Sequence, residues 1–281
     1  KLSNCVLYFL TALHLWGVSQ PNIIIMLADD LGAGDLSCYG SPENKTPHLD
    51  KLAAEGLQFS DFYAASAVCS PSRAALQTGR FSVRAGIYSW VATSQKMHLR
   101  IEETTIAELL KAVGYSTAHV GKWHLGYGLT DDTSGPDPGD HGYDYWLATG
   151  NNANPSHRNP QNFVRNGKAL GEIKGYSCQI VASEAIDWLD NHRDSNKPFF
   201  LNICFHEPHQ RVASPPELAA RHPNVKQPEY YGCIENMDHA AGRILKKLET
   251  LNEADNTLVI FTSDNGSYRT DRANNRNLKG R

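Results

Sequence analysis

The stretch CSPSR at residues 69–73 combines a thiol with a nearby cation at the start of a predicted helix. Ser70 is a good N-cap, the proline after it suits the first helical position, and Gly79 can close the helix. Cys69 would then lie at the positive end of the helix dipole beside Arg73, and both favour an anion there. A buried structural cysteine is the alternative. We treat Cys69 as a candidate nucleophile.

Two acidic pairs follow apolar runs that are typical of strands. The pairs are Asp29 with Asp30, directly after residues 22–28, and Asp264 with Asn265, after residues 257–262. Open α/β sheets place their sites at the carboxyl ends of strands, so the two pairs can meet. Their oxygens are hard ligands, suited to calcium or magnesium rather than zinc. A single pair of this kind would more often be a turn or a helix cap.

Two further clusters follow predicted strands and supply cations and proton carriers. Lys122 and His124 lie in GKWHLG, and His206 and His209 lie in HEPH. A histidine directly after a buried strand is more often structural than catalytic when taken alone. Two such clusters at equivalent strand ends favour a functional role, with His209 the less secure member.

Strands alternate with helices along the chain. The hydrophobic patterns predict strands over 22–28, 116–120, 198–205 and 257–262, and helices over 47–55, 105–113, 178–191 and 234–248. Repeated strand, helix, strand order implies an α/β sandwich with a mostly parallel central sheet flanked by helices. Residues 131–174 are rich in Gly, Pro and Asn, and we interpret them as loops.

Composition and charge exclude some classes of partner. The chain has 281 residues and a formal net charge of −3. A protein that binds nucleic acid through bulk charge would be basic, so we expect no nucleic acid partner. Any anionic ligand must be held by local cations.

The N-terminal residues read as a processing segment. Residues 5–16 form an apolar run after Lys1, and small and polar residues follow it. We predict the remnant of a secretory signal peptide, cleaved before Pro21, and an exported protein. The run is too short for a stable membrane anchor, and a buried amphipathic helix is the alternative.

The remaining cysteines and two glycosylation sequons give weaker signals. Cys38, Cys178, Cys204 and Cys233 are widely spaced and specify neither a disulfide pairing nor a zinc site. The sequon at Asn44 is usable only in a eukaryote. The sequon at Asn265 should be inaccessible if that residue binds metal.

Together these motifs resemble those of type I sulfatases, in the alkaline phosphatase superfamily, of the arylsulfatase and N-acetylgalactosamine-6-sulfatase kind. The matching pieces occur in the family's order: ADD at 28–30, CSPSR with TGR at 78–80, GKWHLG from 121, the histidine after PFFLNICF, and SDNG at 263–266. The resemblance covers residues 21 to 281. It implies an alkaline phosphatase-like sandwich and hydrolysis of a sulfate ester.

The resemblance also implies a modified residue and a metal. Cys69 would be oxidised to formylglycine by a formylglycine-generating enzyme, and the aldehyde hydrate would attack sulfur. An oxygen of formylglycine 69 would join the two acidic pairs in binding Ca²⁺, with Mg²⁺ possible.

The cationic residues take roles by the same resemblance. Arg73 would hold the hydrate and help to ionise it, and His124 would hydrogen-bond to it. Lys122 and His206 would contact the sulfate, with His206 protonating the leaving alcohol. His209 would be a further member of the substrate site.

One departure concerns the C-terminal end. The family carries a second sulfate-binding lysine shortly after SDNG, and this chain stops before it; Lys279 lies in a different register. We therefore expect residues 1–20 to be the signal remnant and residues 21–281 an incomplete catalytic domain that lacks a smaller C-terminal subdomain.

Two other functions stay open on the sequence alone. One is a phosphatase or phosphodiesterase of the same superfamily, whose members generally use Ser or Thr as nucleophile. The other is a binder of sulfated glycans without turnover. Substrate choice is not readable, although Asn151, Asn152, His157 and Arg158 lie in a predicted loop and are polar enough to contact a sugar.

Overall fold

The core of the molecule is a sheet of seven strands. The computed structural model describes residues 20–92, 96–130, 135–267, 269 and 271–278. The sheet has the order β5-β4-β3-β2-β6-β1-β7. Its strands are β1 Asn22–Asp29, β2 Ser116–Lys122, β3 Tyr145–Thr149, β4 Val164–Arg165, β5 Lys168–Ala169, β6 Phe199–Pro208 and β7 Thr257–Ser263. Strands β3, β2, β6, β1 and β7 pair in parallel, each with its neighbour in that order. Strands β4 and β5 are antiparallel and extend the sheet beyond β3.

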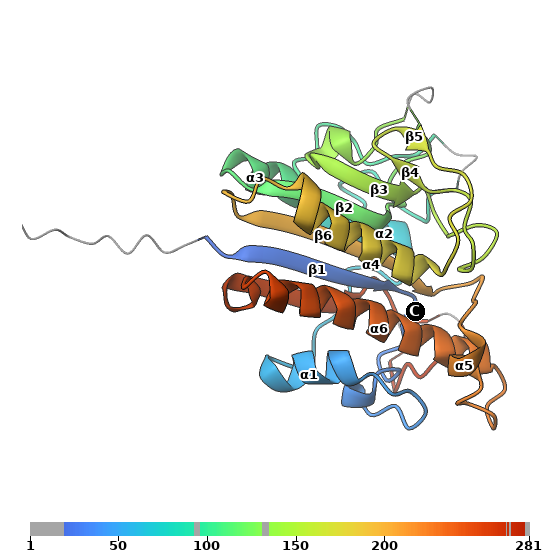
Figure 1. Cartoon of the computed structure of the whole chain (residues 1–281). Helices are drawn as coiled ribbons and strands as arrows, with labels where there is room; N and C mark the ends of the chain where they lie inside the picture. Colours follow the sequence, from blue (N-terminus) through green and yellow to red (C-terminus); the bar gives the residue numbers. More distant parts are fainter. Residues whose placement is uncertain (1–19, 93–95, 131–134, 268, 270, 279–281) are drawn as a thin grey trace, which may run out of the picture.

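Helices cover both faces of this sheet (Figure 1). The helices are α1 Pro47–Glu55, α2 Cys69–Thr78, α3 Ile106–Ala112, α4 Ser177–Asp187, α5 Pro216–Ala219 and α6 Pro228–Thr250. Of these, α1 and α5 pack against α6. Short 3₁₀ turns span Ser37–Tyr39, Gly139–His141 and Ala254–Asn256, and a π-helical turn at Trp188–His192 continues α4. The predicted mostly parallel α/β sandwich is therefore confirmed.

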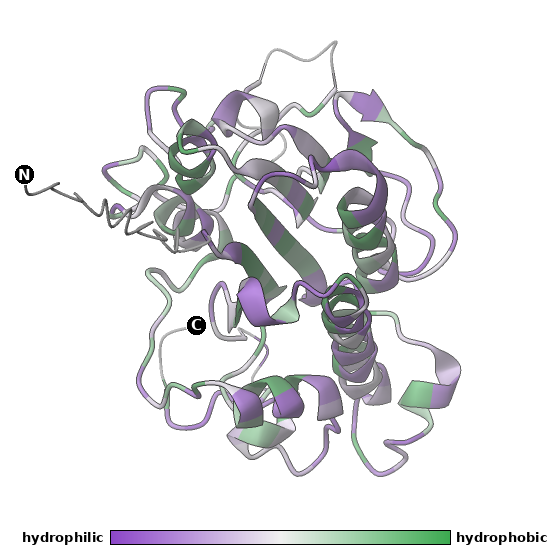
Figure 2. Ribbon diagram, turned by 60° about the vertical axis from the view of Figure 1, so that its left-hand side comes forward, coloured by the Kyte–Doolittle hydropathy of each residue, from purple (hydrophilic) through white to green (hydrophobic). Residues whose placement is uncertain are grey.

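The alternation of side chains along β1 divides the core into two layers. Ile24 and Met26 pack in the cluster formed with α4 and α6, whereas Ile25 packs in the cluster formed with α2 and α3. A strand covered on both faces needs a continuous apolar run, which is the pattern of residues 22–28. Figure 2 shows the hydrophobic residues concentrated in the central strands and the hydrophilic ones toward the outer loops.

The helix starts follow local rules, with one correction. Thr105 and Glu108 form a full capping box at α3, and Pro47 opens α1 after Thr46. At α2 the predicted N-cap is wrong: Val68 takes that position with an extended backbone, and Ser70 lies inside the first turn. Its hydroxyl oxygen instead accepts the backbone N–H of Val91 at 2.9 Å, so it tethers a neighbouring loop.

The interpretation of residues 131–174 as loops was wrong in part. This stretch contributes β3, which pairs in parallel with β2, and the small strands β4 and β5. β3 is a short buried strand within a Gly- and Pro-rich region, so no long apolar run announces it.

The sequon asparagine Asn44 is buried in the folded protein. Its side chain is only 3% exposed, and its amide donates to the backbone oxygen of Asp35 at 2.6 Å. A glycan could not be accommodated there without loss of that hydrogen bond.

The five cysteines in the described part of the chain are all free thiols: Cys38, Cys69, Cys178, Cys204 and Cys233.

Two expectations concern residues that the structure does not describe. The predicted signal remnant falls almost entirely within residues 1–19, and Lys279 lies beyond residue 278. Within the described ranges, no helix is both long and apolar enough to cross a bilayer.

Gly121, at the carboxyl end of β2, offers a test of how closely the strands approach. It has φ +112°, and a Cβ built there would lie 1.9 Å from the backbone oxygen of Cys204 in β6. We expect Gly121→Ala to lower the free energy of unfolding by at least about 3 kcal/mol, because strain and a backbone clash add together. Urea denaturation measures this.

Gly150→Ala is the matched control, since nothing lies within 4 Å of a Cβ at that position and its φ is not in the left-handed region. If both variants lost the same free energy of unfolding, the close contact between the backbones of β2 and β6 at Gly121 would be contradicted.

Candidate active site at the carboxyl edge of the sheet

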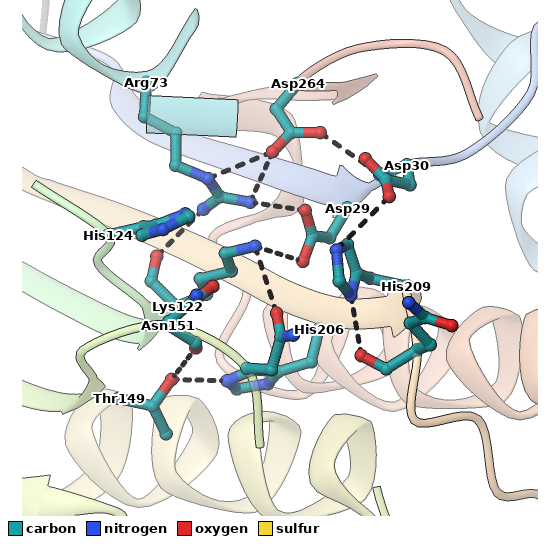
Figure 3. A network of polar contacts seen from close by, with 12 residues as sticks. Asp29, Asp30, Arg73, Lys122, His124, Thr149, Asn151, His206, His209 and Asp264 are labelled. Atoms are coloured by element: carbon teal, nitrogen blue, oxygen red, sulfur yellow. Dashed lines mark hydrogen bonds and ion pairs between the residues drawn. The ribbon is translucent and has the colours of Figure 1, made fainter. Parts of the chain in front are cut away.

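Five parallel strands end at one edge of the sheet, and each delivers polar side chains there. Asp29 and Asp30 come from β1, Lys122 and His124 from β2, Thr149 from β3, His206 and His209 from β6, and Asp264 and Asn265 from β7. Figure 3 shows how these side chains, Asn265 excepted, converge. The acidic pairs and the two histidine clusters therefore lie together at the carboxyl edge of the sheet, as expected.

Helix α2 adds Cys69 and Arg73, which lie one turn apart and so share a face of the helix. The guanidinium of Arg73 is buried and holds Asp264 through Nε at 3.0 Å and Nη2 at 2.7 Å. It also donates to the backbone oxygen of Lys122 at 2.9 Å and lies 3.4 Å from Asp29. Arg73 therefore joins α2 to the ends of β1, β2 and β7.

Lys122 forms the second buried ion pair. Its Nζ donates to Asp29 Oδ2 at 2.7 Å and lies 3.4 Å from Asn152 Oδ1, and neither charged side chain has solvent exposure. Burial alone would raise the pKa of Asp29, but Lys122, His209 and Arg73 outweigh it and hold that pKa well below its usual range. Burial opposes the charge of Lys122, yet Asp29 keeps the pKa of the lysine raised.

The negative charges of Asp30 and Asp264 are less fully balanced by nearby cations than that of Asp29. Burial and the charge of Asp29 raise the pKa of Asp30 to about 6. Burial raises the pKa of Asp264 to about 7, against the opposing effect of Arg73. Three buried carboxylates thus face two cations, and the surplus of negative charge favours uptake of a cation.

The donor atoms fit such a cation. The ligand atoms of Asp29, Cys69 and Asp264 lie within 4.8 Å of one another. Asp29 Oδ1 and Asn265 Oδ1 are buried acceptors that have no hydrogen-bond partner among the described residues. The Asn265 amide donates to Asp30 Oδ1 at 2.5 Å, which leaves its oxygen for another ligand. Carboxylate and amide oxygens in this arrangement suit calcium or magnesium.

The environment of Cys69 differs from the prediction. Its place at the first turn of α2 is confirmed, but its pKa is raised to about 12 rather than lowered. Burial is the main cause, and Asp29, Asp264 and Asp30 add to it against Lys122. The helix dipole and Arg73 do not produce a thiolate here, because Arg73 is already neutralised by the acids around it.

The two strand-end histidines are buried and neutral. Burial lowers the pKa values of His124 and His206 well below their usual range, and Lys122 or His157 adds to this. His124 Nε2 lies 3.0 Å from the backbone oxygen of Val91, and its Nδ1 has no partner among the described residues.

Thr149 determines which nitrogen of His206 carries the proton. The Thr149 hydroxyl donates its one hydrogen to the backbone oxygen of Asn151 at 2.6 Å. Its oxygen must then accept from His206 Nε2, at 2.7 Å. Neutral His206 therefore carries its proton on Nε2. No sequence pattern indicates this role of Thr149.

Glu207 is a second residue whose role the sequence did not reveal. It is fully buried, and its Oε2 accepts the N–H of His206 at 3.0 Å. Its Oε1 accepts the N–H of Cys178 at 2.9 Å and the hydroxyl of Ser177, at the first turn of α4. A carboxylate at a helix N-terminus is stabilised by the dipole, so Glu207 anchors the end of β6 to α4.

The predicted sugar-contacting loop is only partly correct. Asn152 reaches Lys122 and so borders the site. His157, in contrast, is fully buried and packs between Glu207 at 3.8 Å and Cys233 Sγ at 3.5 Å. Burial lowers its pKa. A polar residue in a loop-rich segment predicts a surface position, but this loop folds back on the core.

Comparisons with known proteins agree with this architecture. The sulfatase family model matches residues 21–280. N-acetylgalactosamine-6-sulfatase of Homo sapiens is 36% identical over 271 residues, which cover 88% of this chain and 50% of that protein. Arylsulfatase A of Homo sapiens is 37% identical over 267 residues, covering 88% and 52%. The crystal structure of Ps i-CgsB in complex with k-i-k-neocarrahexaose superimposes with a TM-score of 0.85 and 30% identity, covering 94% of this chain and 62% of that one.

The chain belongs to the sulfatase family, and its sheet and helices have the alkaline phosphatase-like fold. It spans about half the length of the curated relatives it matches.

The anchor at Glu207 generates a prediction about stability. Glu207→Gln keeps the shape but replaces one acceptor oxygen by a donor amide, which faces either the His206 N–H or the N-terminus of α4. We expect a loss of about 1–3 kcal/mol in the free energy of unfolding, measured in urea. Glu102→Gln on the exposed surface is the matched control. A Glu207 variant as stable as this control would rule out the anchoring role.

Proposed function

We propose that the protein hydrolyses sulfate esters at this site. The observation that carries the proposal is the meeting of Cys69 with Asp29, Asp264 and Lys122 in one buried cluster. Membership of the sulfatase family supports it, and so does the CSPSR sequence at the first turn of α2.

Asp29, Asp30, Asp264 and Asn265 would hold a divalent cation, which we take to be calcium. When bound, the cation supplies a Lewis acid next to residue 69. Within the described part of the chain, Asp29 Oδ1 and Asn265 Oδ1 accept no hydrogen bond, and this supports the assignment. Arg73 keeps Asp264 oriented through two hydrogen bonds, so that one carboxylate serves both the arginine and the cation.

We further propose that Cys69 is converted to formylglycine by a formylglycine-generating enzyme. The hydrated aldehyde supplies a nucleophile that an unactivated thiol does not, since burial keeps Cys69 protonated. His124 lies two residues after the end of β2, and its Nδ1 has no partner in the part of the chain that the structure describes. This nitrogen would accept a hydrogen bond from the modified residue.

The protein's own side chains would bind the ester and move the proton. Lys122 stays charged beside Asp29 and would stabilise negative charge on the sulfuryl oxygens. Neutral His206 keeps its Nε2–H on Thr149, which fixes the tautomer and leaves Nδ1 without a partner among the described residues. A second proton taken up on Nδ1 together with the anionic ester would give the imidazolium, which would pass that proton to the leaving alcohol. His209 is assigned to the border of the substrate site.

The substrate class we propose is a sulfated carbohydrate, in an exported protein. Two similar proteins support this class: one is named N-acetylgalactosamine-6-sulfatase, and the other, Ps i-CgsB, was crystallised in complex with k-i-k-neocarrahexaose. Asn152, which borders Lys122, is positioned to contact such a sugar.

The test is hydrolysis of 4-nitrocatechol sulfate by the natural full-length protein, co-expressed with a formylglycine-generating enzyme. We expect turnover that falls at least about a thousandfold in Cys69→Ala, because the variant has no nucleophile to modify. Cys38→Ala, a half-buried thiol away from the site, should retain full activity. Mass spectrometry first verifies formylglycine, which lowers the mass at residue 69 by about 18 Da. Turnover that survives Cys69→Ala, or no turnover of any sulfate ester by the modified protein, would contradict the proposal.

A further inference from the structure

His209 has the orientation of a metal ligand. Its Nδ1 lies 2.6 Å from the backbone oxygen of Gln210, which can only accept, so Nδ1 must carry the proton. Nε2 of the neutral ring then directs a lone pair toward Asp30 Oδ2, at 3.4 Å. Metal-binding histidines are held in this way, with the second ring nitrogen donating to a backbone carbonyl.

Two facing acceptors repel each other unless a cation lies between them. The separation of 3.4 Å matches the distance of about 3.3 Å expected between nitrogen and oxygen ligands in a tetrahedral zinc site.

Cys69 supplies a third ligand to the same point. The ligand atoms of Asp30, Cys69 and His209 all lie within 4.8 Å of one another. Sulfur, imidazole nitrogen and carboxylate oxygen form the donor set of zinc, not of calcium. This set shares Asp30 and Cys69 with the oxygen-rich cluster but differs from it by including His209.

We propose that the folded chain with unmodified Cys69 binds Zn²⁺ through Cys69 Sγ, His209 Nε2 and Asp30 Oδ2. The thiol proton is released to solvent as the Zn–S bond forms, and a fourth position stays open to water. Zinc is then neutralised by one thiolate and one carboxylate, while Arg73 and Lys122 continue to balance Asp264 and Asp29.

The chemical state of residue 69 therefore selects the metal. Thiolate sulfur favours zinc, whereas the oxygens of a formylglycine hydrate remove the soft ligand and favour calcium. A chain that folds before modification would be held in a zinc-bound form with its sulfur ligated. The conversion of Cys69 belongs to the proposed function, but zinc binding by the thiol form does not depend on it.

The experiment uses the chain produced without a formylglycine-generating enzyme, with the thiol at residue 69 verified by mass spectrometry. Co²⁺ serves as the spectroscopic probe and Zn²⁺ as the competitor. We expect one Co²⁺ per chain and a thiolate-to-cobalt charge-transfer band that zinc abolishes. The band should disappear in Cys69→Ser and persist in Cys38→Ser.

His209→Ala should weaken zinc binding by about tenfold or more, and His98→Ala, on the surface, should not. Circular dichroism verifies that each variant is folded, and Asp30→Asn provides a second test if His209→Ala is not. The proposal is overturned if no charge-transfer band forms, if the band survives Cys69→Ser, or if zinc affinity is unchanged in both His209→Ala and Asp30→Asn. Because neither substrate nor modified protein is used, these outcomes are independent of the sulfatase assay.

Discussion

The burial of like charges at one edge of the sheet constrains the rest of the site. Asp29, Asp30 and Asp264 are held together at the ends of two neighbouring strands, and burial raises the pKa of the latter two. Arg73 and Lys122 relieve only part of this repulsion. The parallel sheet places the acids side by side, and α2 must approach closely enough for Arg73 to reach them. The remaining negative charge favours the uptake of a cation at this edge.

This constraint explains why the residues around the acids are arranged so specifically. A buried arginine is tolerable only when its donors are used, and Arg73 contacts Asp264, Asp29 and the backbone of Lys122. The same burial keeps Cys69 protonated, so chemistry at that position requires something to replace or ligate the thiol. In the proposed enzyme, modification replaces the thiol. In the unmodified chain, the proposed zinc ion binds it.

Much of the architecture could be predicted because it depends on short-range patterns. The apolar runs at 22–28 and 198–205 form β1 and β6, and the polar residues after them lie at the shared carboxyl edge. β3 escaped prediction because a five-residue strand among glycines and prolines has too little periodicity. The helix at residue 69 was predicted, but its N-cap was not, since Ser70 is used by the tertiary contact with Val91.

The electrostatics of individual residues could not be predicted from local sequence. The helix position of Cys69 predicts a lowered pKa, and only the three-dimensional proximity of the acids reverses it. His157 and Glu207 belong to one buried network that joins β6 to α4 and α6, from segments far apart in the chain. Such long-range contacts decide protonation and tautomer states, and they are visible only in the folded structure.

The most direct test of the central claim is calcium binding by isothermal titration calorimetry to the protein with residue 69 converted to formylglycine. The account predicts one Ca²⁺ per chain, with affinity lost in Asp264→Asn and retained in Asp271→Asn, an exposed aspartate of the same segment. Calcium should also raise the melting temperature of the wild type, because it binds only the folded state. No calcium uptake, or equal uptake by the Asp264 variant, would contradict the claim that the surplus carboxylates form a cation site.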